Sequence, residues 1–137
     1  MKWTRLIVLA ALITFSSIAS EFDNRLKLAE LGVASAQSNL ANMYYKGQGV
    51  PQDHKQAFKW SRKAAEQGVV SSQYNLGLMY NTGEGVPQDY KQAVKWYKKA
   101  AEQGFASAQQ SLGDSYRFGE GVPQDHKQAF KWSRKAA

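Results

Sequence analysis

A segment of 17 residues occurs twice in this chain without a single difference. Residues 49–65 and 121–137 both read GVPQDHKQAFKWSRKAA, and residues 85–101 carry a close variant, GVPQDYKQAVKWYKKAA. Successive copies lie 36 residues apart, and Leu40, Leu76 and Leu112 keep the same register. A period of this length indicates supersecondary units that bury their apolar faces only against one another. The sequence therefore predicts a stack of similar units.

Each unit is expected to form two antiparallel helices. In the first unit, Ala36, Leu40 and Tyr44 recur every four residues, which places them on one face of a helix over about 35–46. Small residues at Ala41 and its equivalents Gly77 and Gly113 would let neighbouring helices approach closely. Because no segment shows sustained alternation of apolar and polar residues, we expect no strands.

The loop and the second helix of each unit carry their own signals. Pro51 ends the first helix, since it cannot continue through a helical turn. Asp53 is predicted to be the N-cap of the second helix, and Gln56, three residues later, can complete a capping box. Trp60 belongs to the apolar stripe of this helix, and Gly68 supplies the left-handed residue that ends it.

We therefore predict an all-α solenoid of three 36-residue helix-turn-helix repeats at 33–68, 69–104 and 105–137. Residues 20–32 resemble a second helix that lacks its tryptophan, and we expect them to form an N-terminal capping helix. The third repeat stops at Ala137, before its terminal glycine, and is expected to be C-terminally incomplete. Such an uncapped end would expose an apolar edge through which the chain could self-associate.

The first 19 residues have the organisation of a signal peptide. Lys2 and Arg5 precede an apolar run over 6–15, and Ser17 and Ala19 supply the small residues that a signal peptidase reads. The apolar run by itself is short for a bilayer core of about 30 Å, so a permanent anchor is the weaker alternative, beside a buried helix. We expect a periplasmic or secreted product without stable membrane insertion after cleavage.

The cysteine count and the net charge limit the chemistry and the partners that this chain can have. The chain contains no cysteine, which excludes disulfides, thiolate chemistry and cysteine-based zinc sites. Its formal charge of +7 becomes +5 once Lys2 and Arg5 are removed. In an exported protein the counterparts of this charge are anionic envelope polymers, lipid headgroups or acidic proteins, and we expect no nucleic acid partner.

The second repeat carries a specific pattern of residues: Leu76-Gly77, Tyr80, Gly83-x-Gly85-Val86, Asp89, Ala93, Trp96 and Lys99-Ala100-Ala101. This pattern resembles the Sel-one-like repeats, which are relatives of the tetratricopeptide repeat. The resemblance implies a right-handed helical superhelix whose first helices line a concave groove and which serves as a scaffold for protein assembly. It also implies a role of the kind that bacterial members have, in envelope biogenesis or host interaction.

Variation between the repeats points to a binding groove. Across 47–65 and its two copies, 14 of 19 positions are identical, whereas across 32–46 and its copies only 5 of 15 are. A packing scaffold with a varied inner wall is what a protein-binding groove requires, although neutral drift is the alternative. We expect Tyr74 and Leu78 to be exposed anchors. The candidate groove residues are Ser38, Asn42, Tyr45, Tyr74, Leu78, Asn81, Gln110, Asp114 and Arg117.

A second candidate surface is the outer face of the second helices. Its basic residues recur at helical spacing, and the surface could hold an anionic envelope polymer or headgroups. An ordinary solvated face is the alternative. The candidate residues are Lys55, Lys59, Arg62, Lys91, Lys95, Lys98, Lys127, Lys131 and Arg134.

Catalytic and metal-binding patterns are weak in this sequence. His54 and His126 occupy the same repeat position, without the paired spacing of metal ligands, and we expect solvated residues at helix starts. We predict no metal, no cofactor and no catalytic group. Some Sel-one-like relatives with cysteine pairs are described as β-lactamase-like, but this chain lacks the cysteines, so a hydrolase is only a remote alternative.

Overall fold

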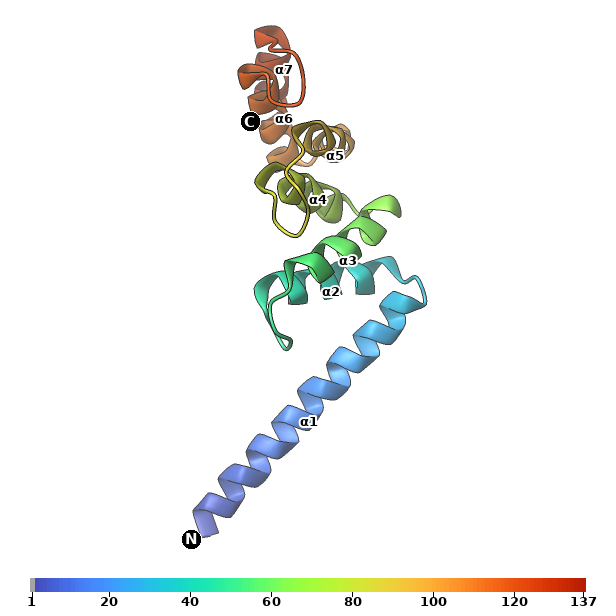
Figure 1. Ribbon diagram of the computed structural model, residues 1–137, viewed down its shortest axis with the longest axis vertical. Coiled ribbons are helices and arrows are strands. Elements are labelled where there is room, and N and C mark those ends of the chain that lie inside the picture. The colour runs from blue at the N-terminus through green and yellow to red at the C-terminus, as the bar shows by residue number, and fades with distance from the viewer. Residues whose placement is uncertain (1) are drawn as a thin grey trace.

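The computed structural model describes residues 2–137, and all regular secondary structure within that range is α-helical. Three helix pairs stack in chain order into a solenoid, and the first helix projects away from the stack as a straight rod (Figure 1). The predicted all-α repeat fold is confirmed. The helices are α1 (Lys2–Glu30), α2 (Ala34–Lys46), α3 (His54–Glu66), α4 (Val70–Thr82), α5 (Tyr90–Glu102), α6 (Ala106–Phe118) and α7 (His126–Ala136).

Local signals in the sequence fix where these helices begin and end. The Asp53 side chain accepts hydrogen bonds from the backbone N–H groups of Lys55 and Gln56, both at 3.0 Å, as an N-cap should. The predicted capping box is wrong, because the N–H of Asp53 donates to the carbonyl of Tyr44 instead, at 2.9 Å. This bond ties the start of α3 to the end of α2.

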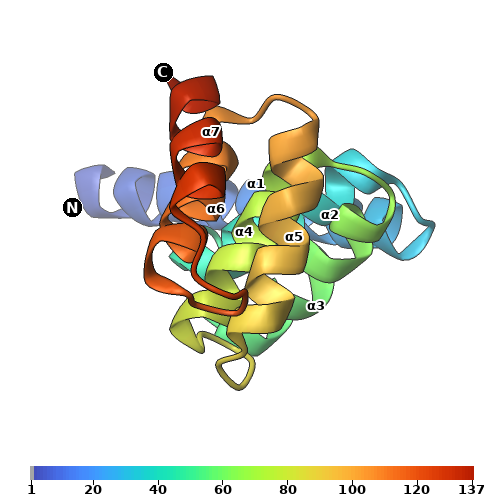
Figure 2. The same ribbon diagram turned by 90° about the horizontal axis from the view of Figure 1, so that it is seen from above.

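The core runs along the stack between the helix pairs. Leu40, Leu76 and Leu112 are completely buried, which confirms the stripe read from the repeats. Between repeats, Phe58 on α3 packs edge-on against Tyr80 on α4, with ring centroids 5.3 Å apart. Seen from above, each second helix lies beside the first helix of its own repeat, and successive pairs are turned relative to one another (Figure 2).

A ladder of glutamines that the sequence analysis did not identify joins the repeats. The Gln73 side chain donates to the carbonyl of Ala65 at 3.2 Å, and its own carbonyl oxygen accepts from Gln103 Nε2 at 2.7 Å. Gln73 is buried, so these bonds satisfy polar groups that water does not reach. The same bonds recur from Gln37 to Ala29, from Gln67 to Gln37 and from Gln109 to Ala101.

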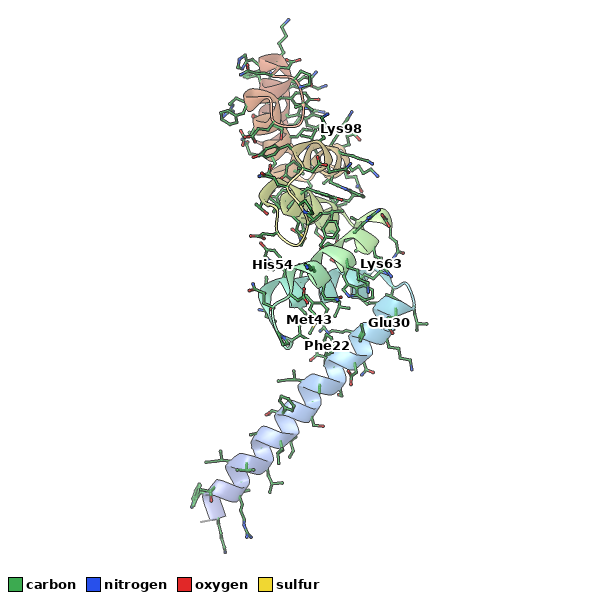
Figure 3. The ribbon with its side chains drawn as sticks, in the orientation of Figure 1. Phe22, Glu30, Met43, His54, Lys63 and Lys98 are labelled. Atoms are coloured by element: carbon green, nitrogen blue, oxygen red, sulfur yellow. The ribbon has the colours of Figure 1, made fainter. Side chains whose placement is uncertain are left out.

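Helix α1 has two physically different halves. Ala29 is buried, and Phe22 and Leu26 pack beside it against α2, with the Phe22 ring 6.0 Å from that of Tyr44 (Figure 3). The preceding turns carry exposed apolar side chains. By length and composition α1 could cross a membrane, with a mean hydropathy of 1.7 over its best window and none of that window buried. A signal sequence meets the same criteria.

The glutamine ladder yields a first prediction. Replacing Gln73 with Ala removes the side-chain donor to the Ala65 carbonyl and leaves Gln103 Nε2 with only its longer bond to the Lys99 carbonyl, at 3.3 Å. We expect the free energy of unfolding to fall by about 1–3 kcal/mol, measured by urea denaturation of the full chain in detergent. Gln110→Ala, at an exposed position, is the matched control and should change it by less than about 0.5 kcal/mol. Equal effects of the two substitutions would contradict a structural role for the ladder.

Candidate protein-binding groove

A pocket of about 280 Å³ opens between the first helices of repeats one and two. Its walls come from α2 and α4, and Ser61 of α3 forms part of its lining. Asn42, Tyr45 and Lys46 are exposed at its rim, so the pocket is accessible from solvent. Apolar walls with a few polar groups are typical of binding pockets. The lining residues are Ala41, Asn42, Tyr45, Lys46, Ser61, Asn75, Leu78 and Met79.

Two differences between equivalent positions of repeats one and two distinguish the region of the pocket. Position 61 on α3 is serine, whereas the equivalent position on α5 is Tyr97. The Tyr97 side chain is buried, and a Cβ placed on Gly77 would lie only 2.6 Å from its ring. The equivalent of Gly77 in repeat one is Ala41, which lines the pocket. In repeat two the Tyr97 ring fills the space beside Gly77. In repeat one Ser61 and Ala41 leave most of the corresponding space open.

Burial and hydrogen bonding raise the pKa of two tyrosines near the pocket. Burial raises the pKa of Tyr97 well above its ordinary value, and the neighbouring Tyr74 and Glu120 add to that rise, while a hydrogen bond with Ser111 opposes it. The pKa of Tyr45 is also raised, mainly because its hydroxyl hydrogen-bonds to Glu84. Both phenols are therefore neutral donors at physiological pH.

Tyr45 connects the pocket rim to the second repeat. Its hydroxyl donates to Glu84 Oε2 at 2.7 Å, and its ring stacks on that of His54 with centroids 5.1 Å apart. His54 is half-buried, and its buried Nε2 has no hydrogen-bond partner among the described residues, so the prediction of a solvated helix-start residue is wrong for His54. The backbone of Gly85 packs directly on the His54 carbonyl, where any side chain would collide. These contacts hold the rim in place.

Of the predicted groove residues, Asn42, Tyr45 and Leu78 come together in this pocket. Leu78 is half-buried and not exposed as expected. The expectation of an exposed anchor is also wrong for Tyr74, whose half-buried ring packs 5.9 Å from Tyr97 and 5.2 Å from Phe105. The aromatic character of Tyr74 serves the core between repeats two and three.

The other predicted groove residues lie outside the pocket. Ser38 Oγ accepts a hydrogen bond from Ser72 at 3.0 Å, which links α2 to α4. The backbone carbonyl of Asn81 accepts from the Gln88 side chain at 2.7 Å. On α6, Asp114 accepts from Gln110 at 3.3 Å and forms an ion pair with Arg117 at 3.5 Å.

Five lining residues were missed by the sequence analysis: Ala41, Lys46, Ser61, Asn75 and Met79. The groove prediction considered only the variable face of the first helices. A signal that points to the pocket is the change from serine at position 61 to tyrosine at position 97, the one difference between α3 and α5 that replaces a small buried side chain by a large one.

The candidate basic face consists of exposed side chains, all nine of them on α3, α5 and α7. Several are engaged locally: Arg62 Nε lies 2.9 Å from Glu66 Oε1, and Lys98 Nζ lies 3.9 Å from Glu102 Oε1. The Glu66 contact raises the pKa of Arg62. Beside them, Lys63, Lys99 and Lys135 lie over the rings of Trp60, Trp96 and Trp132 at 4.6–5.0 Å from the centroids. Part of the basic pattern therefore covers the tryptophans of the core.

Solved structures share this arrangement of helices. The c5321 protein, described as a protective antigen present in uropathogenic Escherichia coli strains with an SLR fold, is 49% identical over 84% of this chain, with a TM-score of 0.80. A Sel1 repeat protein from Oxalobacter formigenes is 40% identical over 77% of this chain, with a TM-score of 0.73. This chain spans only 25% and 43% of the lengths of those two proteins.

A more distant structure shows the fold alone. Helicobacter pylori cysteine rich protein B is 23% identical, with a TM-score of 0.67, and the match covers 89% of this chain and 87% of that protein. No curated protein sequence matches this chain at a significant level. Residues 34–69, 70–105 and 106–137 each match the Sel1 repeat. The chain therefore belongs to the Sel1 repeat family, whose repeats form scaffolds that typically mediate protein–protein interaction.

Proposed function

We propose that this chain is an exported Sel1 repeat scaffold that binds a partner polypeptide in the pocket between α2 and α4. The observation that carries the proposal is the pocket itself, which is open at the rim and lined by the varied first helices. The repeated second helices and the glutamine ladder hold those first helices in fixed positions. A rigid frame with a shaped recess is suited to recognising a protruding side chain of a partner.

Export is supported by the N-terminal half of α1. Its apolar, exposed turns fit a signal sequence, with basic residues before them and small residues after them. The c5321 protein, to which 84% of the chain aligns at 49% identity, is described as a protective antigen, and this description supports a product that leaves the cytoplasm. The half-buried Phe22 and the buried Ala29 would stay with the mature protein and cover the first repeat.

The binding proposal can be tested by site-specific photo-cross-linking in cells. A photoreactive residue at Lys46, on the rim, should capture a discrete partner, whereas the same residue at Lys59, on α3, should not. Asn42→Arg places a long charged side chain at the pocket mouth and should reduce capture from position 46 by about tenfold or more. Gel analysis and mass spectrometry of the cross-linked product provide the measurement.

The matched control is Gln110→Arg, which adds the same side chain to an exposed position on α6 outside the pocket. It should leave capture unchanged. Capture at position 59 but not at position 46 would contradict the pocket and favour the basic face. Capture at position 46 that survives Asn42→Arg would also contradict it.

Processing of α1 gives a separate prediction. The chain expressed in bacteria should yield a product that begins at Ser20 or Glu21, as read by N-terminal sequencing. Ala19→Phe puts a bulky residue where the peptidase requires a small one, and should leave the full-length precursor in the membrane fraction. Ser16→Phe, one turn earlier, is the control and should still be processed. An unprocessed wild-type chain in the membrane fraction would show that α1 is a permanent anchor.

A further inference from the structure

The repeats provide an internal comparison that indicates what the pocket accepts. Corresponding positions in successive repeats lie 36 residues apart, so Ala41, Ser61 and Asn75 of the pocket correspond to Gly77, Tyr97 and Ser111. The Tyr97 ring lies against Gly77 and is only 2% exposed. A phenol ring therefore occupies, between repeats two and three, the region that corresponds to the pocket, and in the pocket only the Ala41 Cβ takes up part of that space.

The chemistry of the open pocket matches that ring. Ala41, Leu78 and Met79 supply apolar surface, and Asn75 supplies a polar side chain in the lining. An asparagine side chain can both donate to and accept from a phenol. The volume of about 280 Å³ lies at the lower end of ligand pockets, a size suited to one large side chain.

We propose that the pocket is a recognition site for a tyrosine side chain presented by the partner polypeptide, with Asn75 as the hydrogen-bonding partner of the phenol. This inference rests on the proposed function and specifies the chemistry of its ligand. The incoming ring lies beside the place that corresponds to that of the chain's own Tyr97 in the next repeat. It is shifted toward the open rim, because the Ala41 Cβ fills the position equivalent to the space next to Gly77 where the Tyr97 ring packs. Ser61 is the residue that determines specificity, because its small side chain leaves the space empty.

The first experiment uses N-acetyl-tyrosinamide as the probe. It is titrated into the isotope-labelled full chain in detergent, and backbone amide shifts are followed by NMR. We expect weak, saturable shifts at Ala41, Asn42, Asn75 and Leu78. The phenylalanine analogue should bind about threefold to tenfold more weakly, because it lacks the hydroxyl that Asn75 would bind, and the leucine analogue more weakly still.

A plugged variant tests the mechanism. Ala41→Gly with Ser61→Tyr reproduces the pair found in repeat two, and should fill the pocket with the chain's own phenol. The probe should then bind at least about tenfold more weakly. Ala41→Gly alone is the matched control and should retain binding, since it leaves the pocket open. A thermal melt of each variant establishes that it is folded, and the plugged variant should melt no earlier than Ala41→Gly.

The converse variant tests the same idea by gain of binding. Tyr97→Ser should open a second pocket and add saturable shifts at Gly77 and Ser111. Absence of saturable shifts in the wild-type protein would overturn the proposal, as would undiminished binding to the folded plugged variant. Shifts confined to α1 would show partition of the probe into the detergent, and would also overturn it.

Failure of this inference and failure of the proposed function are distinguishable. If cross-linking from position 46 depends on Asn42 but the tyrosine probe does not bind, the groove binds a partner through another side chain and only the tyrosine assignment is wrong. If the probe binds and the plug blocks it, while partner capture is unaffected by the plug, the proposed function is wrong. A second copy of this chain as the captured species would identify Tyr45 or Tyr90, both exposed, as the tyrosine to test.

Discussion

The packing of each second helix against the first helix of the following pair is the interaction on which the rest of this structure depends. Phe58 meets Tyr80 edge-on, and Phe22 meets Tyr44 in the same way one repeat earlier. Phe130, the equivalent on α7, is 69% exposed at the end of the stack. A helix pair cannot bury both of its faces by itself, so each aromatic residue becomes part of a core only when a neighbour covers it.

The buried polar groups also depend on the neighbouring repeat. The buried glutamines place their side-chain amides on carbonyls at the end of the preceding second helix, and these bonds satisfy the amides in a region that water does not reach. Because hydrogen bonds are directional, they fix the orientation of one helix pair relative to the next more narrowly than apolar packing does. Such a frame can vary a residue that lines the pocket, and Ser61 on α3, where α5 has Tyr97, is such a change.

Helix α1 has one half suited to a membrane and one half that packs against the protein core. Its last turns carry Phe22 and Ala29, which belong to the protein core, while its earlier turns are apolar on all sides. A helix that is apolar all round is suited to a membrane and an amphipathic one to a protein surface. The change of character occurs near the small residues Ser17 and Ala19, where a signal peptidase would cut.

The repeat, the helix pairs, the Asp53 cap and the buried leucines could all be predicted from the sequence, because each depends on local spacing repeated three times. The predictions of a capping box and of a solvated His54 were wrong, because both depend on contacts outside the local segment. The Asp53 N–H bonds to the Tyr44 carbonyl, and His54 is covered by Tyr45 and Gly85.

The candidate groove, too, could be predicted only in part from the sequence. Variation along the first helices named Asn42, Tyr45 and Leu78, which line the pocket, but periodicity could not tell that Tyr74 packs into the core against Tyr97. Sequence alone thus determined that this chain is a stack of helix pairs with a varied inner wall. Only the tertiary structure decided where that wall is hollow, because a cavity depends on which side chains from α2, α3 and α4 meet, and Ser61 does not fill the space that Tyr97 fills.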